Sequence, residues 1–254
     1  MPQPPRKSAP RTSGLATIDV AHAGTIYKIQ LRRSSAARRF TLRVRAATQD
    51  VVLTIPARGS LSEAKLFVNR HAAWIGTKLQ LLPDKIPLTL GRLVPLRGVL
   101  HLIVDRPARR RGVWLEDGRP DNGGEPLICV NTEPSFVARR VRDFLIKEAT
   151  RDIKAAVERH AERLGLKYRR ITLRDTTSRW GSCSSSGALS FSWRLILSPP
   201  FVLDYLAAHE CAHLLHMNHS AQFWATVARL TTETARAEAW LKAHGSSLLR
   251  FGKD

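Results

Sequence analysis

Residues 207–224 read AAHECAHLLHMNHSAQFW, and this stretch decides how the rest of the chain can fold. Within it, His209, Glu210 and His213 form the pattern H-E-x-x-H. Residues four apart lie on one face of a helix, so the two imidazoles can reach the same point. Zinc needs nitrogen ligands at about 2.0–2.1 Å in a near-tetrahedral shell, which this spacing can supply. Glu210 lies one position round the helix, where it can stay beside a metal as a general base without binding it.

The residues before the motif indicate a helix that is buried on one side. Residues 201–208 form a mostly apolar run after Pro199 and Pro200, and proline favours the first turn of a helix. The expected buried stripe lies at positions 202, 203, 206, 207, 211, 214 and 215. The four histidines and the glutamate of residues 209–219 lie beside that stripe, which favours a helix that lines a cleft over one with ordinary surface histidines.

A catalytic zinc usually keeps three protein ligands and one open position, so a third ligand is expected. His219 follows the second motif histidine by six residues, and a left-handed Asn218 could end the helix and turn His219 back to the metal. Ser220 could then cap the next helix. The competing hypothesis is a carboxylate ligand from a later helix, for which Glu233 and Glu238 are the candidates.

The spacing of the three histidines equals that of the metzincin proteases, but two features exclude that class. His216 stands where metzincins have glycine, and no methionine follows to form their Met-turn. We interpret His216 as a packing residue or a neighbour of the site rather than as a ligand.

Several ordered motifs carry a more specific resemblance, and they are SRWGSCS at 178–184, FSWRL at 191–195, DY at 204–205, HECAH at 209–213, NHS at 218–220 and FW at 223–224. Together they resemble the YgjP-like metallopeptidase family, which is related to the SprT-like zinc proteases. The resemblance is strongest over about 135–245, and residues 27–74 are also similar to the family's leading segment.

The resemblance implies a zincin-like peptidase core in which His209, His213 and His219 bind one zinc ion and Glu210 is the base. Cys211 departs from the aliphatic residue that such proteins often carry. We expect its side chain to point to the other face of the helix, away from the metal.

A hairpin predicted over 178–193 should form one wall of the cleft, and an extended peptide could add to the edge of such a wall. Trp180, Gly181 and Ser182 lie in this hairpin and are therefore candidate substrate-binding residues, although Trp180 is also typical of a core aromatic. Cys183 is better explained as a small packed residue than as a nucleophile.

Arg194 has two interpretations that the sequence does not separate. It could bind a substrate carboxylate or a developing oxyanion, or it could form a structural ion pair with Asp175 or Asp204. Asp204 itself lies five residues before His209, which is too far along the helix for an ideal contact with that ligand.

The chain carries a formal net charge of +20, from 41 Lys and Arg against 21 Asp and Glu, which favours contact with polyanions such as nucleic acid. The charge concentrates in an early group of arginines at 32, 33, 38, 39, 43 and 45 and in a second group at 106 and 109–111. A solvated basic surface explains these groups equally well, because no nucleic-acid-binding motif accompanies them.

The compartment expected from the sequence is the cytoplasm. Three cysteines make an odd count without a C-x-x-C pattern, which suits a reducing environment. No apolar run approaches about 18 residues, so no membrane span is expected, and the start MPQPPRKSAPRTSG lacks the apolar core of a secretory signal.

The pattern of elements predicts an α+β fold in three parts. Residues 1–16 are expected to be a disordered basic tail, residues 17–132 a β-rich region with one helix at 61–82, and residues 133–254 the zincin-like catalytic domain. Three antiparallel strands are expected within 17–56, and further short strands within 88–132. The catalytic domain should contain a long helix over 135–164 that ends at Gly165, an antiparallel sheet, the H-E-x-x-H helix and C-terminal helices.

These observations predict a zinc-dependent metallopeptidase with one Zn2+ per chain and a peptide or protein substrate. In it a zinc-activated water hydrolyses the peptide bond and Glu210 is the general base. One alternative is a SprT-like protease that the basic surface recruits to nucleic acid. The other is a non-enzymatic zinc-binding protein, which would have no use for the base.

Overall fold

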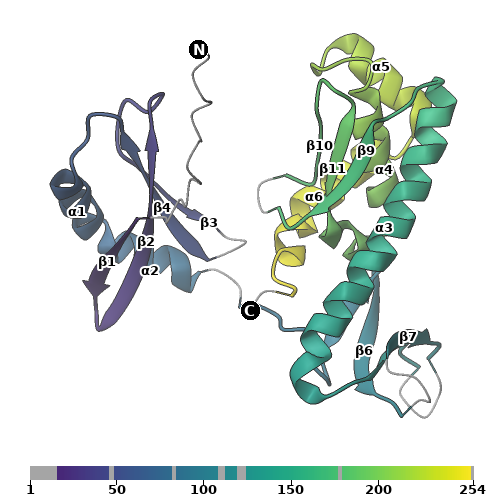
Figure 1. The fold of residues 1–254 in the computed structure, drawn as a ribbon, viewed down its shortest axis with the longest axis horizontal. Coiled ribbons are helices and arrows are strands. Elements are labelled where there is room, and N and C mark those ends of the chain that lie inside the picture. The colour runs from purple at the N-terminus through teal and green to yellow at the C-terminus, as the bar shows by residue number, and fades with distance from the viewer. Residues whose placement is uncertain are drawn as a thin grey trace, which may run out of the picture. The chain divides into compact units, whose positions relative to one another are not determined.

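A computed structural model describes residues 16–45, 49–81, 84–107, 112–118, 124–176 and 179–252 (Figure 1). The chain divides into two compact units, Met1–Leu82 and Pro83–Asp254. The tail expected over 1–16 lies outside the described residues except for Ala16. No helix in the described ranges has the length and apolar character that a bilayer crossing requires.

The first unit is a four-stranded sheet with two helices on one face. Its strands are β1 (Thr17–His22), β2 (Thr25–Ser34), β3 (Thr41–Arg45) and β4 (Asp50–Pro56), in the order β1-β2-β4-β3. Helices α1 (Leu61–Arg70) and α2 (Ala72–Gln80) supply Val68 and Ile75 to a core that includes Ile29 and Leu53 from the sheet. Because side chains alternate along a strand, Lys28, Arg32 and Arg43 lie on the face that the helices leave open.

Two expectations for this unit are wrong. The sheet has four strands where three antiparallel strands were expected. Strand β2 pairs with β4 in parallel, because the chain passes through the edge strand β3 before it returns to the middle of the sheet. Alternation of apolar residues predicts which face a side chain takes, but it does not predict the partner strand. The single helix expected at 61–82 is interrupted at His71, which lies between α1 and α2. The His71 ring forms a hydrogen bond with the Phe67 carbonyl oxygen at 2.7 Å through Nδ1.

The second unit begins with a sheet of the same topology as the first. Its strands are β5 (Leu93–Leu96), β6 (Val99–Asp105), β7 (Gly112–Glu116) and β8 (Leu127–Asn131), in the order β5-β6-β8-β7. The sequence analysis grouped these strands with the N-terminal region, whereas the structure's division into units falls at Leu82 and Pro83 rather than at 132. The side chains of β8 explain the difference, because Ile128 and Val130 pack into the same core as the long helix of the second unit.

The remainder of the second unit carries the H-E-x-x-H motif. Its elements are η2 (Pro134–Phe136), α3 (Val137–Leu164), β9 (Arg170–Arg174), β10 (Gly181–Cys183), β11 (Ala188–Ser192), η3 (Trp193–Leu197), α4 (Pro200–Ala212), α5 (Ala221–Leu230) and α6 (Thr234–Leu248). Helix α3 runs from the β5–β8 sheet to the β9–β11 sheet and ends at Gly165, which has φ 68° as a left-handed cap requires (Figure 1). The α+β class is confirmed, but the sheet β10-β11-β9 is mixed because β9 runs parallel to β11.

Helix α4 is held against α3 by apolar packing and by the polar contacts of Asp204. Val202, Ala208 and Cys211 of α4 are fully buried in the core that α3 shares. Asp204 of α4 accepts a hydrogen bond from His160 Nε2 at 2.9 Å and pairs with Arg159, both of α3. The hydrogen bonds and positive charges of these partners lower the pKa of the Asp204 carboxyl, although burial acts in the opposite direction.

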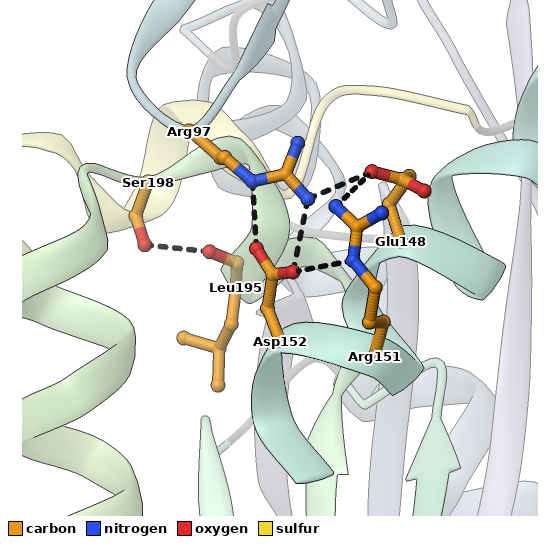
Figure 2. A network of polar contacts seen from close by, with 6 residues as sticks. All are labelled: Arg97, Glu148, Arg151, Asp152, Leu195 and Ser198. Carbon is orange, nitrogen blue, oxygen red and sulfur yellow. Dashed lines mark hydrogen bonds and ion pairs between the residues drawn. The ribbon is translucent and has the colours of Figure 1, made fainter. Parts of the chain in front are cut away.

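A charged network fixes the segment that leads into α4 (Figure 2). Arg97 and Gly98 form the two-residue turn between β5 and β6, and their φ angles of 53° and 80° are those of a type I′ turn. The Arg97 guanidinium binds Asp152 Oδ2 and Glu148 Oε2 of α3, each at 2.7 Å. Its backbone N–H donates to the Ile196 carbonyl oxygen of η3 at 2.7 Å. The turn therefore ties the β5–β8 sheet to α3 and to the residues immediately before α4.

We predict that Arg97→Ala lowers the free energy of unfolding by about 2 kcal/mol, because it leaves the buried Glu148 carboxylate with fewer partners. Alanine keeps the same backbone strain at positive φ, so the change isolates the side chain. Urea denaturation measures the effect. Lys154→Ala is the matched control, because its pair with Glu158 is exposed and its loss should change stability by less than about 0.5 kcal/mol.

Candidate metal centre

The two motif histidines lie at the end of α4, and the chain then turns back sharply. Helix α4 ends at Ala212, and tight turns follow in which Leu214 N–H donates to the Cys211 carbonyl at 3.0 Å. The prediction of a left-handed conformation at Asn218 is wrong. Among the described non-glycine residues, φ is positive only at Ala23, Gln49 and Arg97. Since the helix ends six residues earlier than expected, Asn218 has no helix to cap. Ser220 does cap α5, as expected, through its hydroxyl and Phe223 N–H at 3.4 Å.

This path brings His209, His213 and His219 together. One ligand atom from each of the three side chains lies within 4.8 Å of the others. His209 Nε2 and His219 Nε2 are 3.2 Å apart. Two nitrogens of a tetrahedral zinc shell are about 3.3 Å apart, as bond lengths near 2.05 Å require. The spacing of these atoms therefore fits a metal of that size.

Contacts at Nδ1 of two of the rings, His209 and His213, help to orient them toward the common point. His213 Nδ1 donates to the His216 carbonyl oxygen at 2.9 Å, so His216 contributes through its backbone. Tyr205 Oη donates a hydrogen bond to Glu238 Oε1 at 2.8 Å. The same oxygen lies 3.4 Å from His209 Nδ1 and can accept a hydrogen bond from it. Hydrogen bonds of this kind orient metal-binding histidines and fix their tautomer.

The carboxylates proposed as alternative third ligands lie elsewhere. Glu238 accepts a hydrogen bond from Tyr205, and Tyr205 in turn lies between Glu238 and His209. Glu233 pairs with Arg236 at 3.1 Å and lines a separate cavity beside the start of α4. Of the two hypotheses for the third ligand, the positions of the side chains favour His219.

The surroundings of His209 and His213 favour the neutral imidazole, which is the form that binds metal. Burial is the main cause that lowers the pKa of His209 to about 4, and the neighbouring His213 and His219 lower it further. Burial also lowers the pKa of His213, although its bond to the His216 carbonyl opposes this. The residues present therefore fit a metal ion that prefers nitrogen ligands, and three imidazoles favour zinc among the common metals.

Glu210 lies beside the three histidines without joining them. The three histidines and Glu210 line one cavity of about 520 Å³. The Glu210 side chain is 4% exposed, and its Oε2 atom has no hydrogen-bond partner among the described residues. Burial raises the pKa of Glu210 to about 7, against the opposing effect of the Arg179 charge. A carboxylate in this position can accept a proton from a group that enters the cavity.

Gly181 leaves the space that the Glu210 carboxylate occupies. A Cβ atom at Gly181 would lie 2.7 Å from Glu210 Cγ and 2.8 Å from Cδ, which is closer than real contacts allow. The sequence predicts Gly181 as a substrate-binding residue, and in the structure the atoms that a Cβ there would meet are those of the candidate base. Strand β10 therefore contributes to the site by the absence of a side chain.

The remaining predicted site residues divide into two groups. Ser182 lines the cavity with Glu210, whereas Trp180 lines a neighbouring groove and packs partly into the core. Cys183 also lines the cavity, and burial, reinforced by the charge of Glu210, raises the pKa of its thiol to about 11. A thiol that stays protonated at neutral pH is a weak nucleophile, which supports the packing interpretation.

Arg194 does not reach the cavity. It is fully buried, forms an ion pair with Asp175 and donates to the Phe251 carbonyl oxygen from Nε at 3.1 Å and from Nη2 at 2.9 Å. Its guanidinium carbon also lies 4.5 Å from the centre of the Trp193 ring. Of the two interpretations of Arg194, the structural ion pair with Asp175 is the one observed. Its bonds to the Phe251 carbonyl oxygen also anchor that residue to the core.

Sequence reasoning missed two aromatic residues of the site. The Phe223 ring is fully buried and lies 4.9, 4.5 and 4.8 Å from the rings of His209, His213 and His219 respectively. Tyr205 supports His209 from the preceding helical turn. The spacing of Tyr205, four residues before His209, was a usable signal. For Phe223 the local spacing gave no such signal, because its position depends on the turn between α4 and α5, and only the FW motif at 223–224 pointed to it.

Binding of nucleic acid through the basic surface stays a prediction. Arg32 and Arg43 lie on the open sheet face of the first unit, and the arginines at 109–111 lie outside the described residues.

Comparison with known protein families gives a match to the YgjP-like metallopeptidase domain over residues 38–244. No curated protein and no solved structure was found to match the chain. The matched range contains every residue of the histidine cluster and most of both compact units. The chain belongs to the YgjP-like metallopeptidase domain family.

Proposed function

We propose that the protein is a zinc-dependent peptidase that hydrolyses peptide bonds in peptide or protein substrates with Glu210 as the general base. One observation carries the proposal. Three imidazoles have ligand atoms within 4.8 Å of one another, and a buried carboxylate with an unpaired oxygen lies in the same cavity. His209, His213 and His219 would hold a single zinc ion, and zinc bound there would activate water and polarise the scissile carbonyl.

The residues of the chain then have separate tasks. Glu210 takes a proton from the attacking water and passes it to the leaving amine, which its raised pKa suits at neutral pH. Gly181 leaves the space that the Glu210 carboxylate occupies. Tyr205 and the His216 carbonyl hold two of the imidazoles in orientation.

Strand β10 supports a way for the substrate to bind. It is an edge strand of the sheet β10-β11-β9, and Gly181, Ser182 and Cys183 line the cavity of the histidines. An extended peptide can add to such an edge through backbone hydrogen bonds. Its scissile bond would then lie beside Glu210.

The non-enzymatic alternative does not account for Glu210. Keeping a carboxylate buried without a hydrogen-bond partner costs free energy, and a purely structural metal site gains nothing from it. Such a residue is expected where chemistry requires it.

We predict that purified protein binds one zinc ion per chain and that His219→Ala loses most of it. His216→Ala is the matched histidine control and should keep zinc, because only its backbone carbonyl contacts the site. Elemental analysis after mild dialysis measures both. Zinc that stays in His219→Ala and disappears in Glu238→Gln would instead identify a carboxylate as the third ligand.

Glu210→Gln should keep zinc and lose at least about 100-fold in turnover, because glutamine has nearly the same shape but cannot take a proton. Cleavage of a mixture of internally quenched peptides, with zinc content measured in parallel, tests this. A Glu210→Gln protein that cleaves at the wild-type rate would show that Glu210 is not the base.

Gly181→Ala should also lower turnover, by about 100-fold, while zinc binding is unchanged, because the added methyl group displaces the Glu210 carboxylate. Gly112→Ala is the control, since its added Cβ would meet no atom within 4 Å. Equal turnover in the two glycine variants would contradict the role assigned to Gly181.

A further inference from the structure

A second cavity opens on the outer face of the β10-β11-β9 sheet. It has a volume of about 650 Å³, and its charged lining residues are Arg170, Arg174 and Arg179. We call it the arginine groove. Among the described residues, no aspartate or glutamate lines it. Most of its other lining residues carry hydroxyl groups, and they are Thr172, Thr176, Ser182, Ser184, Ser186 and Ser190.

The register of the sheet explains this composition. Ile171 and Leu173 of β9 pack against the core, so Arg170, Thr172 and Arg174 point to the outer face. Thr172 lies opposite Ser190, and Ser190 lies opposite Ser182. A row of three hydroxyl residues therefore crosses the sheet, and Arg170 and Arg174 lie on either side of it on β9.

The three arginines are exposed, and the described part of the chain gives their guanidinium groups no hydrogen bond, although the Arg179 charge also acts on Glu210 in the adjoining cavity. The nearest acid in sequence, Asp175, is already paired with Arg194 and Arg142. Guanidinium groups bind carboxylates through paired hydrogen bonds, and hydroxyl groups can add further donors. The groove is therefore built for an anionic ligand.

The groove adjoins the metal cavity, because the two share four lining residues. Arg179, Gly181, Ser182 and Cys183 line both. Two strand spacings separate β10 from β9, which is about 10 Å or three residues of extended peptide. A peptide added to the β10 edge runs along β10, so it reaches the arginines only where it leaves that edge and crosses the outer face; residues three or four positions from a scissile bond at Glu210 can then lie among them.

We propose that the arginine groove is a specificity subsite that selects peptide substrates with acidic side chains within about four residues of the scissile bond. The proposal rests on the peptidase function and adds the substrate class. A single-stranded nucleic acid fits the groove less well, because such ligands bind to aromatic platforms. The one aromatic side chain in the described lining, Trp180, packs partly into the core and lies close to Gly245.

The cleavage test compares two internally quenched peptides with the same central sequence, one flanked by Asp and Glu and the other by Asn and Gln. At low salt, zinc-loaded wild-type protein should show a kcat/KM about tenfold higher for the acidic peptide. The double variant R170Q/R174Q should reduce the ratio of the two values to about one. Arg139→Gln, an exposed arginine outside the groove, should keep the wild-type ratio.

A binding test separates failure of this proposal from failure of the peptidase function. Fluorescence anisotropy with zinc-loaded Glu210→Gln protein should show about tenfold tighter binding of the acidic peptide than of its amide counterpart, whether or not any peptide is cleaved. Arg179→Gln, a change in a loop, provides a second variant if R170Q/R174Q does not fold.

Three results would overturn the proposal. One is equal binding of the acidic and amide peptides, and another is a preference that survives R170Q/R174Q. The third is tighter binding of a single-stranded oligonucleotide than of the acidic peptide, with loss of that binding in R170Q/R174Q. Zinc-dependent cleavage that does not distinguish the two peptides would leave the peptidase function standing and remove only the acidic specificity.

Discussion

Three imidazoles must converge on one point, and the packing of the second unit has to keep them there. His209 and His213 come from the last turn of α4, while His219 returns from beyond it, so the reversal of the chain must be held in place. Phe223 supplies that support, because its buried ring contacts all three imidazoles. Ser220 fixes the start of the helix that carries it. A small shift of α5 would therefore move the third ligand away from the other two.

The position of α4 itself depends on contacts outside the cavity. Asp204 binds two side chains of α3, and the Arg97 turn joins α3 to the residues before α4 (Figure 2). Helix α4 is almost wholly buried, and Glu210 is buried with it. Burial is what raises the pKa of Glu210 and lowers that of His209. The packing that stabilises the unit thus also sets the protonation states on which the proposed chemistry depends.

The sequence was most informative where chemistry follows from local spacing. The four-residue interval from His209 to His213, the Ser220 cap and the Gly165 stop are properties of a single helix or its ends, and each was predictable. Predictions failed where the outcome depends on distant partners. The parallel pairing of β2 with β4 needs contacts far apart in sequence. The sequence left two interpretations of Arg194 open for the same reason, because its bonds to the Phe251 carbonyl oxygen also join distant residues. The role of Gly181 became visible only when Glu210 was placed against it.

The central claim is that three histidines, and no other side chain, hold the metal. X-ray absorption at the zinc edge of the zinc-loaded protein tests it most directly. The structure predicts three imidazole nitrogens and one oxygen, all at about 2.0–2.1 Å. A sulfur atom at about 2.3 Å would place Cys183 on the metal, and a shell with only two imidazoles would exclude His219, so either result would contradict the account.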